Sequence, residues 1–130
     1  MKKAGFTLIE ILIAVLIIGM IYSIVLPFSQ RLLEKYQALK AVEELKVFIL
    51  KKKSEAFFYG EKIEIISKEG VLFVNENETF SLKDTYIDLE NPLIFYPLGT
   101  TNGGIIKARA GSFEFKLEIL APFGEIRESF

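Results

Sequence analysis

The sequence predicts an α+β protein in which one long N-terminal helix packs on an antiparallel β-sheet head. An apolar run with a single charge covers residues 6–28, and a helical pattern with few helix breakers continues to residue 59. From residue 60 onward, apolar and polar residues alternate with a period of two, which is typical of strands with one buried face. The chain of 130 residues therefore divides into a helical part and a part made of strands.

The apolar run is long enough to cross a membrane. As a helix that rises about 1.5 Å per residue, Phe6–Phe28 exceeds the hydrocarbon thickness of about 30 Å. Its one charged residue is Glu10, and a lone carboxylate inside a membrane helix costs on the order of 2.5–3.5 kcal/mol. Glu10 therefore calls for a positively charged partner.

The residues before the run form a short basic leader, Met1–Gly5, which contains two lysines. Cleavage after Gly5 would make Phe6 the first residue and give it a free α-amino group. Glu10 lies about one helical turn from that amine. In side-by-side helices staggered by a turn, the carboxylate of one subunit would meet the amine of the next, so we interpret Glu10 as an assembly residue.

The segment GFTLIE and the apolar run after it closely resemble the class III signal of type IV prepilins and of the pseudopilins of type II secretion. Pro27 also falls where many pilins carry a proline. The resemblance implies that prepilin peptidase cleaves between Gly5 and Phe6 and N-methylates Phe6. It also implies assembly through the first residues of the helix, which are Phe6, Thr7, Leu8, Ile9 and Glu10.

The same resemblance implies where the protein works. It predicts a single-pass inner-membrane protein with a cytoplasmic N-terminus and a periplasmic C-terminal head, which later becomes part of a filament. The implied partners are prepilin peptidase, other pilin or pseudopilin subunits bound through the N-terminal helix, an inner-membrane assembly platform and the lipid bilayer. No cofactor is implied. Gly19 and Pro27 are expected to let the helix between them loosen in the filament, since glycine lowers helix propensity and proline removes a backbone hydrogen bond.

Two other N-terminal signals share part of this pattern. A secretory signal has an apolar core of about 7–15 residues followed by a cleavage site. This run is longer, contains an acid and ends without a small-x-small site. The remaining alternative is an uncleaved signal anchor, in which the two lysines keep the N-terminus in the cytoplasm. This alternative does not explain why the membrane segment contains Glu10.

The composition argues against an enzyme or a metal protein. The chain has no histidine and no cysteine, so it can form neither a Ser-His or Cys-His nucleophile nor a usual zinc site. A net charge of −1 does not favour nucleic acid as a primary partner. The glycine-rich segment 99–104 lacks the lysine of a phosphate-binding loop and is interpreted as a tight strand connection. Two acidic pairs lack the spacing of a calcium loop and are assigned to the solvated surface: Asp84 with Asp88, and Glu76 with Glu78.

The helix is expected to continue to about Phe58 and to end at Gly60. We interpret Lys51–Lys53 as solvated partners of the helix dipole. We assign Tyr36 and the aromatic residues 57–59 to the core, where the helix docks on the sheet. Apolar residues at three- and four-residue steps would face the sheet; they are Leu32, Tyr36, Leu39, Val42, Leu45 and Ile49.

The alternating part predicts short strands joined by tight turns. One hairpin is expected to turn at Lys68–Gly70 and another at Gly111–Ser112, and Asn91–Pro92 breaks the chain between them. The expected strands are residues 61–67, 71–75, 79–83, 85–89, 93–96, 105–110, 113–120 and 125–128. The phenylalanines available to the buried face are Phe48, Phe57, Phe73, Phe80, Phe95, Phe113 and Phe115.

The C-terminal half carries a second resemblance. The order of IFYPLGTTNGGII, a strand of alternating polarity and a closing FGEIR is similar to the end of the H-type minor pseudopilins, the GspH/FimT group. This chain is shorter and has Tyr96 before Pro97. The resemblance implies a minor subunit near the filament tip.

The predicted function is therefore structural rather than enzymatic: a minor pseudopilin of a type II secretion pseudopilus. A minor pilin of a type IV pilus is the alternative within the class. A membrane-anchored binding domain that never assembles is the alternative outside it. The expected organisation is a leader at 1–5, a transmembrane and assembly half of the helix at 6–28, an amphipathic half at 29–59 and a periplasmic β-sheet head at 60–130.

Overall fold

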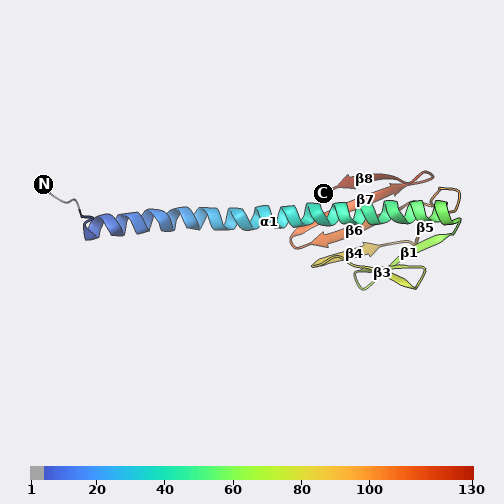
Figure 1. Ribbon diagram of the computed structural model, residues 1–130, viewed down its shortest axis with the longest axis horizontal. Coiled ribbons are helices and arrows are strands. Elements are labelled where there is room, and N and C mark those ends of the chain that lie inside the picture. Colours follow the sequence, from blue (N-terminus) through green and yellow to red (C-terminus); the bar gives the residue numbers. More distant parts are fainter. Residues whose placement is uncertain (1–4) are drawn as a thin grey trace. The chain divides into compact units, whose positions relative to one another are not determined.

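The computed structural model describes residues 5–130, which form two compact units. The first unit ends at Leu33, and the second, Glu34–Phe130, is called the globular unit below. Helix α1, Leu8–Tyr59, supplies the regular structure of the first unit and the helical layer of the globular unit (Figure 1). It begins at Leu8 rather than at the expected Phe6.

The C-terminus of α1 is closed by a glycine, as predicted. Gly60 has a φ of 64°, in the left-handed region that favours glycine. The N–H of Glu61 donates to the carbonyl of Ala56 at 3.1 Å, which satisfies one of the last carbonyls of the helix. The turn that follows leads the chain into the first strand.

Within the globular unit, α1 buries one face against the strands. Val42, Leu45 and Ile49 are buried, which confirms this part of the predicted stripe. The N-terminal part of the stripe is wrong, because its members are exposed to between 43% and 67%; they are Leu32, Tyr36 and Leu39. At that end of the unit the buried positions belong to two alanines, Ala38 and Ala41.

The aromatic residues at the end of α1 are also exposed, contrary to the core assignment. Phe57 is 59% exposed, Phe58 79% and Tyr59 74%. Ala56 occupies the position that faces the strands and is fully buried. Because each residue advances about 100° around a helix, Phe57 and Phe58 turn away from that face, whereas Tyr59 is the last residue of α1 and lies exposed at its end.

One antiparallel sheet has the strand order β3-β2-β1-β5. Its strands are β1 (Ile63–Lys68), β2 (Val71–Val74), β3 (Glu78–Phe80) and β5 (Leu93–Phe95). The hairpin expected at Gly70 joins β1 and β2, with Ile65 opposite Val74. The strand expected at 79–83 ends early at Phe80, since the chain turns through Asp84, whose φ is 53°.

A second antiparallel sheet has the order β4-β6-β7-β8. Its strands are β4 (Thr85–Leu89), β6 (Gly104–Ala110), β7 (Phe113–Leu120) and β8 (Glu125–Ser129). The hairpin predicted at Gly111–Ser112 joins β6 and β7. Phe115, Leu117 and Ile119 are buried while the residues between them are more exposed, so the predicted alternation of β7 is confirmed.

The two sheets are separate ladders, whereas a single sheet was expected. Ser67 at the end of β1 joins them, because its hydroxyl accepts the N–H of Leu89 at 2.9 Å and donates to the carbonyl of the same residue at 3.2 Å. The N–H of Ile87 also donates to the carbonyl of Gly70 at 3.2 Å. A side chain and a turn carbonyl thus replace a continuous ladder between β1 and β4.

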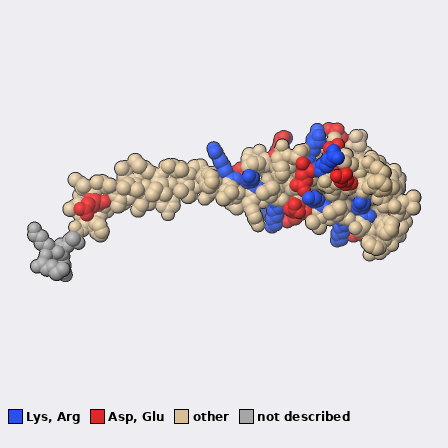
Figure 2. Space-filling model, turned by 90° about the horizontal axis from the view of Figure 1, so that it is seen from above, with Lys and Arg blue, Asp and Glu red and all other residues tan. Residues whose placement is uncertain are grey.

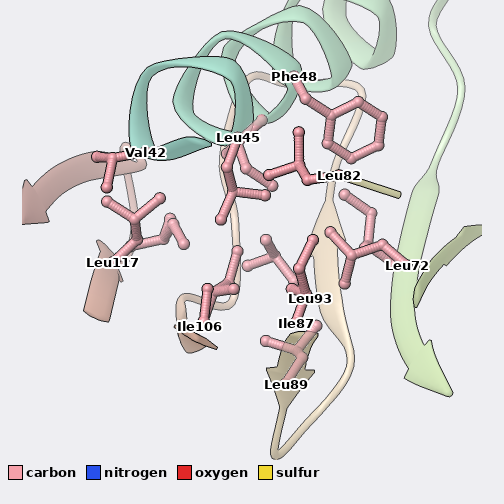
Figure 3. Close-up of a cluster of buried hydrophobic side chains, with 14 of the residues drawn as sticks. Val42, Leu45, Phe48, Leu72, Leu82, Ile87, Leu89, Leu93, Ile106 and Leu117 are labelled. Atoms are coloured by element: carbon pink, nitrogen blue, oxygen red, sulfur yellow. The ribbon is translucent and has the colours of Figure 1, made fainter. Parts of the chain in front are cut away.

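The core lies between α1 and both sheets. Val42 of α1 lies beside Leu117 of the second sheet, and Phe48 lies on the side of Leu72 of the first sheet (Figure 3). Of the phenylalanines predicted for the core, Phe48, Phe95 and Phe115 are buried, Phe73, Phe80 and Phe113 are half-buried, and Phe57 is exposed. One long N-terminal helix on antiparallel sheets confirms the predicted α+β, pilin-like architecture.

Candidate processing and assembly site

Helix α1 begins with a capped first turn. The carbonyl of Thr7 accepts the N–H of Ile11 at 3.2 Å, the first hydrogen bond of the helix. The hydroxyl oxygen of Thr7 accepts the N–H of Glu10, also at 3.2 Å. Thr7 is therefore the N-cap residue, and one of the helix's otherwise unpaired N–H groups is satisfied by its side chain.

The peptide bond predicted to be cleaved lies just outside the helix. Gly5 and Phe6 have no helical structure, and the Phe6 side chain is 84% exposed. A side chain built on Gly5 would meet no atom within 4 Å. Among the described residues, nothing covers the bond between Gly5 and Phe6.

Glu10 lies in the first turn of α1 on the surface of the first unit. A carboxylate there interacts favourably with the positive end of the helix dipole. Within residues 5–130 this carboxylate makes no hydrogen bond and no ion pair. The backbone N–H of Glu10 donates the capping hydrogen bond to Thr7, and the Glu10 carboxylate takes no part in it.

The helix surface after Glu10 is apolar and uncovered. α1 includes an 18-residue window with a mean hydropathy of 2.7, none of it buried, so α1 is long and apolar enough to cross a membrane. Leu8 is 75% exposed and Ile9 67%. Figure 2 shows one acidic spot near the described N-terminal end, followed by a stretch without charge.

Gly19 and Pro27 both lie inside α1, which is helical throughout that part. A side chain added at Gly19 would meet nothing within 4 Å. Pro27 has no N–H, so the carbonyl one turn before it loses its usual donor. Glycine and proline are the two least favourable residue types for a helix interior, so these positions are weak points of α1.

The globular unit holds one charged cluster that the sequence interpretation missed. Lys52 was assigned to solvent, but it is only 3% exposed. Its Nζ donates to Glu78 at 2.6 Å and to Glu55 at 3.0 Å, and lies 5.7 Å from the ring centre of Phe48. Burial tends to lower the pKa of Lys52, but the hydrogen bonds with Glu78 and Glu55 outweigh it and raise the pKa above its ordinary value.

A spacing in the sequence does point to Lys52. Phe48, Lys52 and Ala56 follow one another at four-residue steps, so all three share the buried face of α1. Lys53, its neighbour, is partly covered because its Nζ donates to the carbonyl of Phe123. Of the lysine run, Lys51 alone is exposed as predicted.

The other ion pairs between distant segments are at the surface. Lys46 of α1 binds Glu128 of β8, and this hydrogen bond raises the pKa of Lys46. Lys107 binds Glu90 at 2.9 Å, which raises the pKa of the lysine and lowers that of the carboxyl. Exposed pairs of this kind contribute little to stability.

The glycine-rich segment 99–104 connects β5 to β6, as predicted. The Asn102 side chain accepts the N–H of Ile94 at 2.8 Å and donates to the carbonyl of Pro92 at 2.9 Å. Gly103 has a φ of 76°, and a side chain there would come within 2.9 Å of the carbonyl oxygen of Ile119. The segment is a tight connection, and a residue with a side chain at position 103 would strain its backbone.

Acidic residues do not gather into a candidate metal centre in the part of the chain that the structure describes. Asp84 lies in the turn before β4 and Asp88 within β4, where the Asp88 carboxylate accepts the Ser67 hydroxyl at 3.3 Å. Glu78 belongs to the Lys52 cluster rather than to a pair with Glu76.

A long apolar helix that begins after an exposed Gly–Phe bond and continues onto antiparallel sheets is a pilin-like architecture. The family model of the prokaryotic N-terminal methylation motif matches residues 1–26, which include Gly5, Phe6 and Glu10. This match supports a type IV pilin-like protein of the class that prepilin peptidase processes. No curated protein matches the chain, and no solved structure does.

Proposed function

We propose that the chain is a minor structural subunit of a type II secretion pseudopilus. The observation that carries the proposal is the methylation motif placed at the start of an uncovered apolar helix, with a single carboxylate in its first turn. Such a surface can contact lipid while the subunit is in the membrane and neighbouring helices after it enters the filament. The minor role rests on the resemblance of the C-terminal half to H-type pseudopilins.

The proposed life of the subunit has two stages. Residues 1–5 are a leader, residues 6–28 hold the protein in the inner membrane, residues 29–59 continue the helix and residues 60–130 are the periplasmic head. Prepilin peptidase hydrolyses the bond after Gly5 and transfers a methyl group from a methyl donor to the new amine of Phe6. The membrane stores the subunit until an assembly platform extracts it.

Assembly exchanges lipid contacts for contacts between helices. Because lipid tails are as apolar as the helix, packing and polar pairs rather than the hydrophobic effect decide how membrane helices associate. The pair between the Glu10 carboxylate and the Phe6 amine of a neighbouring subunit supplies the register. Thr7, Leu8 and Ile9 lie between these charges and pack in the same contact.

Analysis of the mature N-terminus tests the proposal. Mass spectrometry of the protein recovered from cells is expected to show a chain that begins with N-methylated Phe6. A chain that still carries Met1–Gly5 would instead identify a membrane-anchored binding domain. Neighbouring genes separate the remaining alternatives, since secretion components accompany a pseudopilin and a retraction ATPase accompanies a minor pilin.

A Gly5→Leu change is expected to block processing, because the small residue before the cleaved bond is replaced by a bulky one. The mature mass should increase by the whole leader, and the protein should remain in the membrane. Gly5→Ala is the matched control, since alanine is still small and should be cleaved. An unchanged mature mass for Gly5→Leu would rule out this cleavage site.

Gly19 and Pro27 are expected to allow the helix between them to lose hydrogen bonds in the filament. The physical reason is that glycine disfavours helix by about 1 kcal/mol relative to alanine and that proline lacks a donor. Cryo-electron microscopy of the wild-type filament is expected to show a loosened segment between the two residues, and a Gly19→Ala/Pro27→Ala variant is expected to show a continuous helix. Unbroken hydrogen bonding in the wild-type filament would refute the hypothesis.

A further inference from the structure

The start of α1 and the bond proposed for cleavage are two residues apart. Residues 5–7 are non-helical, and the helix begins at Leu8. The boundary is set by Thr7, whose hydroxyl oxygen accepts the N–H of Glu10 at 3.2 Å. The order Thr-x-x-Glu is the sequence of a capping box, in which the first residue ends the helix on its N-terminal side.

The position of this boundary matters for hydrolysis. A protease has to reach the carbonyl carbon between two residues, and in a helix that carbonyl is hydrogen-bonded and enclosed by the neighbouring turns. Gly5 and Phe6 have neither obstacle, because they are outside the helix and exposed. The described chain thus presents the bond in an accessible form.

Without a cap, extension of the helix toward the N-terminus becomes favourable. The N–H groups of its first turn lack partners, and in or near hydrocarbon water cannot satisfy them well. One more turn of helix would satisfy them and would include Phe6 and Gly5. Glycine opposes this extension, but by only about as much as a capping side chain contributes.

We propose that Thr7 is a positioning residue for processing: its cap stops α1 short of the Gly5–Phe6 bond and keeps that bond outside the helix, where the peptidase can reach it. The inference rests on the proposed function, since it presumes cleavage there. Hydrolysis adds one water across the bond and produces a carboxyl group on Gly5 and an α-amino group on Phe6. Thr7 takes no part in that step and acts only through the backbone conformation before it.

Substitutions at Thr7 separate the cap from the shape of the side chain. Thr7→Val keeps the shape and removes the accepting oxygen, whereas Thr7→Ser and Thr7→Asn keep a capping oxygen on side chains of different shape. Cleavage of the full-length Thr7→Val precursor by its peptidase in detergent micelles is expected to be about five-fold slower than that of the wild type, by the usual effect of a lost cap. Thr7→Ser and Thr7→Asn are expected to stay within about two-fold of the wild-type rate, since both rank with threonine as caps.

A spectroscopic readout follows the bond itself. Gly5–Phe6 is the one Gly-Phe pair in the sequence, so labelling glycine with ¹³C at the carbonyl and phenylalanine with ¹⁵N gives a single correlated NMR signal from the uncleaved precursor. In Thr7→Val the Gly5 carbonyl shift is expected to move toward helical values. In Thr7→Ser and Thr7→Asn it is expected to stay at the wild-type value.

The possible outcomes are distinct. Slow cleavage of Thr7→Val together with the helical shift supports the cap. Wild-type cleavage of Thr7→Val overturns the inference and leaves the proposed function intact. Slow cleavage without the shift also overturns it, in favour of direct recognition of the hydroxyl by the peptidase. If the wild-type precursor itself is not cleaved at this bond, the proposed function fails and the inference fails with it.

Discussion

Replacing Glu10 with alanine is expected to leave cleavage after Gly5 intact and to reduce incorporation into filaments by at least about tenfold. The carboxylate is the single charge in the apolar run, and within the described residues it has no partner. Removing the carboxylate lowers the free energy of the membrane-inserted subunit by on the order of 2.5–3.5 kcal/mol on insertion scales. It also leaves the Phe6 amine of the neighbouring subunit without a counter-charge, so the filament loses stability while the stored subunit gains it.

The measurement is the amount of subunit in sheared or affinity-purified filaments relative to the amount in the membrane. Glu10→Gln keeps the size of the side chain and removes its charge, so it should fail as Glu10→Ala does. Glu44→Ala removes an exposed acid from the globular part of the same helix, where the i,i+4 partner Lys40 lies at 3.9 Å, and should assemble normally. Normal filament recovery for Glu10→Ala would refute the charge pair.

The second large effect is expected at Lys52 in the globular unit. A Glu55→Gln/Glu78→Gln variant leaves a buried ammonium group without counter-charges and should lower the free energy of unfolding by about 2 kcal/mol. This expected loss is smaller than the loss for fully buried ion pairs, because Glu78 is half exposed and water screens part of its attraction to Lys52. Lys52→Met should cost less than about 1 kcal/mol, because methionine fills a similar volume beside Phe48 and the two acids can be hydrated.

Urea unfolding of the full chain in detergent micelles, followed by circular dichroism and tyrosine fluorescence, measures both variants. The triple variant, Lys52→Met/Glu55→Gln/Glu78→Gln, should recover most of the stability lost in the double variant, because no buried charge remains. If Lys52→Met is the more damaging change, losing the charge costs more than leaving it without counter-charges, and the desolvation argument is wrong.

The raised pKa of Lys52 also predicts a pH dependence. A lysine whose pKa is higher in the folded than in the unfolded protein stabilises the fold at every pH below its ordinary value of 10.5. That contribution is lost as the pH rises through the folded-state pKa. The wild type should therefore lose stability above about pH 10 more steeply than Lys52→Met.

The apolar, uncovered start of α1 could be predicted from the sequence, because its features are local, whereas the roles of Gly5, Phe6 and Glu10 in processing and assembly stay predictions. Gly5, Phe6 and Glu10 lie within two turns of one another, and their solvent exposure needs no tertiary contact. The C-terminal end of α1 was equally predictable, since Gly60 is recognisable as a helix terminator. The cap at Thr7 has a sequence signal as well, the Thr-x-x-Glu spacing, but the sequence interpretation considered Thr7 and Glu10 only as assembly residues.

The burial pattern of the globular unit was less predictable. Lys52 was assigned to solvent and is buried, whereas Phe57 was assigned to the core and is exposed. The charge of Lys52 predicts exposure and the apolar ring of Phe57 predicts burial, and both predictions are wrong. Which face of α1 is covered depends on where the strands lie, and the two glutamates that neutralise Lys52 include one from β3, a strand distant in the sequence.

By itself, the sequence determined the long helix, its apolar and uncovered N-terminal half, the acid in its first turn and the two β-hairpins, because hydrophobic period, turn glycines and helix caps act over a few residues. The tertiary structure alone decided that the strands form two sheets joined through Ser67, that alanines rather than Tyr36 and Phe57 are buried at the two ends of the contact with α1, and that Lys52 is enclosed by Glu55 and Glu78. These features depend on which segments meet, and the free energy of such contacts comes from close packing and charge neutralisation between residues that the sequence keeps apart.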